Sequence, residues 1–161
     1  MESMIFQQLV NGLAVGAVYS LIALGFTMVY GVLRIVNFAH GGVYMVGAFL
    51  GLTAAKVLGV NLFISLPIAM AGAAALGLLI ERVAFTPLRG ADPYSGLLSS
   101  LGVATILPIM AQMIWGAATQ PYPVGVKFQT FMVGNVAINA MQIVILIAAL
   151  SLMGGLYLFV Q

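Results

Sequence analysis

The residues with the most chemical capacity lie in one short stretch, LRIVNFAHGGVYMVGAF, at positions 33–49. A polar, glycine-containing segment interrupts apolar sequence here. Irregular backbone at membrane depth persists only where protein or a water-filled cavity satisfies its polar groups, and the ends of broken helices often face a substrate path. Asn37 can cap a helix start, and His40 can donate or accept a hydrogen bond. Two interpretations stay open: a polar break on a solute path, or a plain turn solvated by water.

The rest of the chain offers no arrangement for catalysis or metal binding. It contains one histidine, three carboxylates and no cysteine, which gives neither a metal-ligand spacing nor a nucleophile with its base. The P-loop, G-x-S-x-G and H-E-x-x-H patterns do not occur. We therefore predict no catalytic residue, no metal site and no cofactor. The centres of the apolar runs carry no ionisable residue, which disfavours coupling to protons or sodium.

The composition identifies the elements that must hold this stretch in place. Of the 161 residues, 63% are hydrophobic and 5% are charged, against about 25% charged in soluble domains. This excludes a soluble enzyme, a nucleic-acid binder and a disordered tail. A helix needs about 20 apolar residues to cross a bilayer, and uncharged runs of that length predict an all-α integral membrane protein. We expect one transmembrane domain over residues 1–161, a polytopic helical bundle whose five spans are 7–32, 43–60, 62–82, 95–115 and 136–160.

The basic residues predict the orientation. They divide three to two between the two ends of the spans: Arg34, Arg82 and Arg89 on one side, Lys56 and Lys127 on the other. Lys and Arg are in excess on the cytoplasmic side, so we expect the N-terminus outside and the C-terminus inside. Arg89 and Asp92 then lie inside, where they either position a cytoplasmic partner or are solvated. Residues 121–131 lie outside and are candidates for contact with an external protein.

Small residues recur at four-residue spacing, which lets membrane helices approach closely. The predicted packing positions are Gly12, Gly16, Gly47, Gly51, Ala73 and Gly77, with Ala69 in the same stripe as Ala73. Polar residues inside the spans need partners. We expect Ser20 and Thr27 to bond to a carbonyl one turn back. Asn139 and Gln142 either reach a neighbouring helix or mark where the fifth span meets water.

Two blocks of the sequence carry a family resemblance. ALGFTMVYGVLRIVNFAHGGVYMVGAF (23–49) and ERVAFTPLRGADPYSGLLSSLGVATIL (81–107) resemble the LivH-type permease subunits of ATP-binding-cassette importers for branched-chain amino acids. The resemblance runs over essentially the whole chain and covers the N-terminal half of such a permease. Urea and short-amide permeases share the Asn-Phe-Ala-His-Gly run. An alternative is therefore a urea or amide permease of the same family, and another is a structural membrane protein without a substrate path.

The resemblance implies a location, partners and site residues. It implies a multi-pass protein of the cell inner membrane that works with a second permease subunit, cytoplasmic ATPase subunits and an extracytoplasmic amino-acid-binding protein, in contact with lipid and not with nucleic acid. We expect that residues 1–161 alone do not couple transport to ATP hydrolysis. The residues expected to line the substrate path are Asn37, Phe38, His40, Gly41, Gly42 and Tyr44. Phe38 and Tyr44 would contact an aliphatic side chain.

Overall fold

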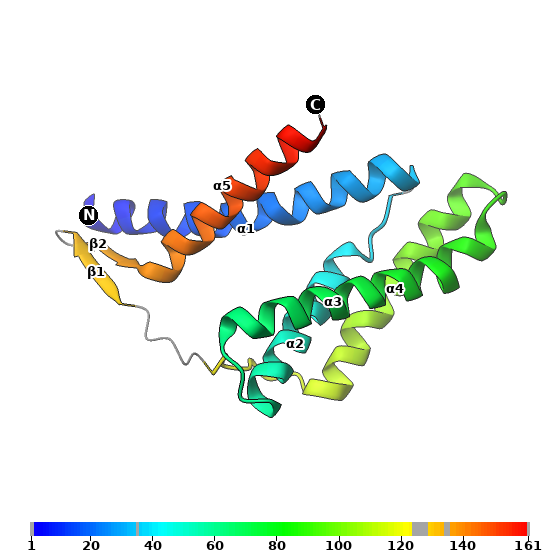
Figure 1. Ribbon diagram of the computed structural model, residues 1–161. Coiled ribbons are helices and arrows are strands. Elements are labelled where there is room, and N and C mark those ends of the chain that lie inside the picture. The colour runs from blue at the N-terminus through cyan, green and yellow to red at the C-terminus, as the bar shows by residue number, and fades with distance from the viewer. Residues whose placement is uncertain (1, 35, 124–128, 134–135, 161) are drawn as a thin grey trace. The chain divides into compact units, whose positions relative to one another are not determined.

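The computed structural model describes residues 2–34, 36–123, 129–133 and 136–160 (Figure 1). These residues form five α-helices and one two-stranded sheet. In chain order the elements are α1 (Glu2–Leu33), α2 (His40–Val57), α3 (Leu62–Ile80), α4 (Pro93–Trp115), β1 (Thr130–Val133), β2 (Val136–Asn139) and α5 (Ala140–Val160). They belong to two compact units, Val29–Val126 and Met1–Met28 with Lys127–Gln161, which are described separately.

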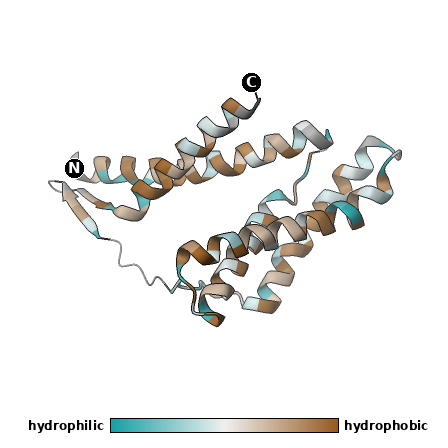
Figure 2. Ribbon diagram, viewed as in Figure 1, coloured by the Kyte–Doolittle hydropathy of each residue, from teal (hydrophilic) through white to brown (hydrophobic). Residues whose placement is uncertain are grey.

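The helices are apolar on all sides. Among the described residues, three helical segments are long and apolar enough to cross a membrane: Met4–Gly31, Leu62–Leu88 and Tyr94–Trp115. Apolar residues continue along most of each helix (Figure 2), and large side chains such as Phe63 and Met113 are 76% and 82% exposed within the chain. A helix without a polar face fits lipid or a partner helix as its surroundings. The prediction of an all-α membrane bundle is confirmed, with a short hairpin added to it.

In the unit Val29–Val126, α2 contacts both α3 and α4. Two glycines of α2 lie in close contact with alanines of α3. A Cβ built on Gly47 would lie 3.2 Å from the Cβ of Ala73, and one on Gly51 would lie 3.1 Å from the Cβ of Ala69. Only hydrogen atoms at these two positions leave room for the backbones to come this close.

Helix α3 does not end at Ile80 but continues as a π-helical segment, Glu81–Phe85, and a 3₁₀ turn, Thr86–Leu88. A π-helical segment disturbs the regular backbone hydrogen bonds and leaves carbonyls in need of other donors. The hydroxyl of Ser99 on α4 supplies one of them, since it donates to the carbonyl of Ala84 at 2.8 Å. This bond ties the start of α4 to the irregular end of the third span.

Side-chain oxygens begin two of these helices. Asn61 precedes α3 and accepts a hydrogen bond from the backbone N–H of Ile64 at 3.1 Å. Asp92 precedes α4 and accepts from the N–H of Tyr94 at 2.9 Å, with Pro93 in the first helical position. Both are N-caps in the usual sense, and each satisfies a donor that the first turn of a helix leaves free.

The other unit pairs α1 with the hairpin and α5. Strands β1 and β2 are antiparallel, with Phe131 opposite Ile138. The Gln7 side chain of α1 makes two hydrogen bonds to the backbone of Ala137, donating to its carbonyl at 2.9 Å and accepting from its N–H at 2.8 Å. Gln142 on α5 donates to Asn11 on α1 at 3.0 Å. The side-chain amides of Gln7, Asn11 and Gln142 are therefore hydrogen-bonded inside this unit.

Several sequence predictions about these polar residues have an outcome. Ser20 donates to the carbonyl of Gly16 and Thr27 to that of Ala23, which confirms the expected bonds one turn back. Of the two alternatives for the pair 139 and 142, Gln142 takes the first and reaches the neighbouring helix. Asn139 instead lies at the helix start, where its side chain accepts from the N–H of Met141 at 2.9 Å.

The bounds of all five helices differ by a few residues from the predicted spans, and two of these differences have a clear structural reason. The fifth predicted span starts at residue 136, but residues 136–139 form β2 and the helix starts at Ala140, because an apolar run alone does not distinguish a buried strand from a helix. The second predicted span is 43–60, but α2 runs from His40 to Val57. Gly59 follows with a φ of 63°, a left-handed conformation that favours glycine and ends the helix.

A cavity between α2 and α4

The polar break is shorter than the sequence predicts. The side-chain oxygen of Asn37 accepts from the N–H of Ala39 at 3.0 Å, and the carbonyl of Asn37 accepts from the N–H of His40 at 3.2 Å. These bonds form a turn that starts α2 at His40. His40, Gly41 and Gly42 were expected in the irregular break but lie in the first helical turn.

This turn packs against α4. Ala39 is fully buried in a cluster with Ile80, Phe85 and Leu107. A Cβ built on Gly42 would lie 2.8 Å from Cδ1 and 3.1 Å from Cβ of Leu107, so glycine lets the start of α2 touch α4. Ser100, also fully buried, donates to the carbonyl of Val36 at 3.2 Å. These contacts fix the position of the break relative to the helices around it.

A cavity of about 530 Å³ lies between α2 and α4, further along both helices. Its wall is mostly apolar, and amide and hydroxyl groups line part of its edge. The lining residues are Tyr44, Met45, Ala48, Phe49, Leu52, Pro108, Ala111, Gln112, Gly116, Ala117, Ala118, Thr119, Gln120 and Tyr122. We call it the α2–α4 cavity. Of the six residues predicted to line a substrate path, Tyr44 is the one in this list, and it is 51% exposed.

Two aromatic rings stack beside the cavity. Phe49 of α2 and Trp115 of α4 have ring centroids 5.0 Å apart and planes inclined by 16°. The indole N–H of Trp115 also donates to the hydroxyl of Thr53 on α2 at 2.7 Å. Aromatic stacking and a hydrogen bond at one position give a contact of defined geometry. The two helices are thus joined firmly at this end of the cavity.

The segment after α4 closes one side of the cavity. The chain turns at Gly116, whose φ is 84°, and then returns toward α2 and α3. Gln120 accepts from the ammonium group of Lys56 at 2.7 Å. Tyr122 shares a short hydrogen bond with the buried hydroxyl of Ser65 and donates to the carbonyl of Gly51 at 3.4 Å. The sequence analysis did not single out Gln120 or Tyr122, since a polar side chain in a loop carries no spacing signal.

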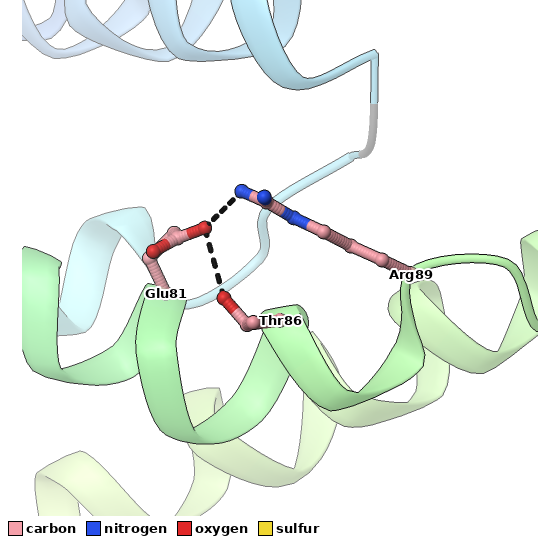
Figure 3. Close-up of polar contacts among 3 residues, drawn as sticks. All are labelled: Glu81, Thr86 and Arg89. Atoms are coloured by element: carbon pink, nitrogen blue, oxygen red, sulfur yellow. Dashed lines mark hydrogen bonds and ion pairs between the residues drawn. The ribbon is translucent and has the colours of Figure 1, made fainter.

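A second cavity of about 460 Å³ lies at the opposite ends of the helices, in the same unit. We call it the arginine cavity. Its lining residues are Tyr30, Arg34, Val36, Leu88, Arg89, Gly90, Ala91, Asp92, Tyr94, Gly96 and Leu97. Next to it the Arg89 guanidinium reaches back over the turn to form an ion pair with Glu81, and Thr86 donates to the same carboxylate oxygen at 3.1 Å (Figure 3). The predicted path residues 37–42 line neither of these two cavities.

The predicted packing residues fall into two groups. Gly47, Gly51 and Ala73 lie in the α2–α3 contact described above. Gly12 and Gly16 instead line an apolar groove between α1 and α5, and a Cβ on either would meet no atom within 4 Å. A Cβ on Gly77 of α3 would likewise meet no atom within 4 Å. Four-residue spacing of small residues is thus compatible with a tight contact and with an open face.

Comparison with known proteins places the chain in a family. Residues 8–161 match the family described as "Branched-chain amino acid transport system / permease component". Similar curated proteins are the high-affinity branched-chain amino acid transport system permease proteins BraD of Pseudomonas aeruginosa, 37% identical, and LivH of Salmonella typhimurium and Escherichia coli K12, 34% and 33% identical. Each alignment covers 96% of this chain and 54% of the relative, so the chain spans about half the length of these curated relatives.

The comparison with solved structures gave no match. The family match covers nearly all of the chain and agrees with three helices long and apolar enough to cross a membrane, which makes this a multi-pass membrane protein. The chain belongs to the family of permease components of branched-chain amino acid transport systems.

Proposed function

We propose that this chain forms part of the substrate path of an ATP-binding-cassette importer that moves branched-chain amino acids across the cytoplasmic membrane. The observation that carries the proposal is the α2–α4 cavity, in a chain similar to permeases named for this substrate class. Ligand pockets in proteins measure roughly 300–1,000 Å³, and this cavity falls inside that range at about 530 Å³.

The lining of the cavity fits the two halves of a branched-chain amino acid. Met45, Leu52 and Ala111 supply apolar wall, and burial of an aliphatic side chain in such surroundings is worth about 1.5–3 kcal/mol. The amides of Gln112 and Gln120 supply donors and acceptors for the amino and carboxylate groups. Urea has no apolar part, so this wall gives it no binding energy, and the cavity favours an aliphatic amino acid over urea.

Lys56 adds the charge that a carboxylate needs. Its ammonium group is held at Gln120, which itself lines the cavity. The side chain is exposed, so its charge acts on a solute that approaches the cavity. A cation at the entrance raises the local concentration of anionic groups. With the N-terminus outside, as the arginine distribution predicts, Lys56 and the cavity entrance face the extracytoplasmic side, where a binding protein delivers the amino acid.

The partners follow from the same proposal. Energy comes from cytoplasmic ATPase subunits, because the described residues of α1, α3 and α4 carry no acidic or basic side chain near the helix centres to couple to an ion gradient. A second permease subunit completes the path. Arg89 and Asp92 lie on the side that faces the ATPases. Of the predicted path residues, Asn37 and His40 lie at the start of α2 and Tyr44 lines the α2–α4 cavity.

The test is uptake of radiolabelled leucine by cells that express the complete importer containing this chain. Ala48 is exposed and lines the cavity, so Ala48→Phe fills the space without displacing buried atoms. Ala74→Phe places the same ring at an exposed position of α3 outside the cavity and is the matched control. We expect Ala48→Phe to reduce leucine uptake at least tenfold and the control to retain it.

Competition by unlabelled solutes distinguishes the substrate classes. Excess isoleucine or valine should abolish the leucine signal, and urea or acetamide should leave it unchanged. Normal uptake by Ala48→Phe at normal surface expression would contradict a role for the cavity. Uptake of labelled urea but not of leucine would contradict the substrate class.

A further inference from the structure

The position of the arginine cavity along the helices indicates its depth in the membrane. The three apolar segments that are long enough to span end or begin at Gly31, Leu88 and Tyr94. The cavity is lined by Tyr30, Leu88 and Tyr94, so it opens where the apolar part of the protein stops. This is the level of the phospholipid headgroups, where tyrosine side chains are enriched.

The carboxylates around the cavity are already occupied. Asp92 lines it, but its side chain caps α4 by accepting from the N–H of Tyr94. Glu81 accepts from Arg89 and from Thr86. Glu81 is therefore engaged by Arg89 and Thr86, and the carboxylate of Asp92 is held at the start of α4, where its charge faces the positive end of the helix dipole.

The guanidinium groups of Arg34 and Arg89 have N–H groups that are not used in hydrogen bonds among the described residues. The backbone N–H of Arg34 donates to the carbonyl of Tyr30 at 2.8 Å, but among the described residues its guanidinium has no hydrogen-bond or ion-pair partner, although it lines the cavity. Arg89 donates to Glu81 through Nη2, its side chain is 67% exposed, and a guanidinium carries five N–H groups in total. Planar N–H pairs of this kind match the oxygens of a phosphate group.

We infer that the arginine cavity binds the phosphate group of an anionic phospholipid, with Arg34 as the main contact and Arg89 beside it. Basic pockets between helices on the cytoplasmic side are the usual binding places of such headgroups. The two tyrosines contact the glycerol and the first part of the acyl chains. The bound lipid fills the arginine cavity. This site is independent of the transported substrate.

The experiment measures which lipid stays bound to the full chain. The chain is reconstituted in nanodiscs of equal parts phosphatidylcholine and phosphatidylglycerol, released into mild detergent, and examined by native mass spectrometry. We expect retained phosphatidylglycerol to exceed phosphatidylcholine several-fold. Arg34→Gln should remove that excess and bring the ratio of the two lipids close to one, because one lost charge-assisted hydrogen bond is worth about a factor of ten.

Two further variants keep the result interpretable. Arg34 has a φ of 53°, which is strained for any residue with a Cβ, so Arg34→Gly removes the guanidinium and relaxes the backbone. It should fold at least as well as the wild type, by circular dichroism, and still lose the lipid preference. Arg82→Gln is the charge control, because Arg82 is exposed on the same end of the helices and does not line the cavity.

Four outcomes would overturn the proposal. One is equal retention of the two lipids by the wild-type chain, and another is an equal loss in Arg34→Gln and Arg82→Gln. A third is stabilisation by inorganic phosphate that needs Arg34 and occurs without any lipid preference, since the site would then serve a free anion. The fourth is loss of ATPase co-purification in Arg34→Gln with lipid retention intact, since the cavity would then be a protein contact. Leucine uptake is measured separately, so failure here leaves the substrate proposal untouched.

Discussion

The contact between α2 and α3 allows one prediction to be worked out in numbers. In Gly51→Ala the new methyl group would lie 3.1 Å from the Cβ of Ala69 and 3.7 Å from the carbonyl oxygen of Ser65. The Cβ of an alanine has no rotatable bond by which to move aside, so one of the two helices must shift. Gly77→Ala is the matched control, because it adds the same methyl group to α3 where no atom lies within 4 Å.

The two variants differ in packing and share their backbone effect. Replacing glycine by alanine inside a helix stabilises it by about 0.5–1 kcal/mol, and this holds for both. A methyl group forced into a close contact costs about 1–3 kcal/mol, and this holds for Gly51→Ala only. We therefore expect Gly77→Ala to unfold at slightly higher denaturant than the wild type and Gly51→Ala at lower, with a difference of about 1–3 kcal/mol between them.

The single tryptophan provides the assay. Trp115 is the only tryptophan of the chain, and it stacks on Phe49 of α2. Its fluorescence therefore reports whether α2 stays attached to α4 when sodium dodecyl sulfate is titrated into dodecyl maltoside micelles. Coincident unfolding curves for Gly51→Ala and Gly77→Ala would refute the close approach of α2 and α3. An equal shift of both to higher denaturant would show that helix propensity alone acts at these positions.

Four other perturbations have defined outcomes. Thr53→Val removes the acceptor of the indole N–H and should lower the free energy of unfolding by about 1 kcal/mol in the same titration. Ser99→Ala leaves a carbonyl of the π-helical segment without its donor and should cost about 1–3 kcal/mol. Glu81→Gln, which breaks an exposed ion pair, should cost less than about 1 kcal/mol in that titration. In intact cells, an impermeant maleimide should label Leu58→Cys directly and Ala91→Cys only after permeabilisation.

The controls for these variants come from the same chain. Thr105→Val removes a hydroxyl that bonds only within its own helix, so a loss equal to that of Thr53→Val would argue against a special role for the indole contact. A larger effect of Glu81→Gln than of Ser99→Ala would reverse the order that burial predicts. The natural chain has no cysteine, so labelling of Ala91→Cys in intact cells with Leu58→Cys protected would invert the expected orientation.

The helices were predictable because length and continuous hydrophobicity determine them. A run without charges, such as residues 4–33, has few stable conformations in lipid other than a helix, and α1 runs from Glu2 to Leu33. The bounds were less predictable where a side chain decided them. Helix α2 starts at His40, three residues before the predicted start at Val43, directly after a turn in which Asn37 accepts from the N–H groups of Ala39 and His40.

The candidate site was predictable only in part, for a different reason. The sequence predicted a polar break over residues 34–42 from a change in composition; in the structure Ala39 and Gly42 of this stretch pack against Leu107 of α4. The α2–α4 cavity depends on Gln112 of α4 and on Gln120 and Tyr122 of the segment that follows α4. No spacing along the chain connects such residues, since they become neighbours only after the chain turns at Gly116.

Long-range hydrogen bonds show most directly what the sequence alone does not predict. Gln7 could pair with any backbone group at the same depth, and its partner, Ala137, is 130 residues away. Inside an apolar medium an unpaired amide is costly, so the sequence requires that Gln7 has a partner without naming it. The choice falls to Ala137 because residues 136–139 are a strand and expose a backbone N–H and C=O together. A helix over the same residues, as the hydropathy predicts, would have used both backbone groups internally and left Gln7 only its contact with Asn11 on the same helix.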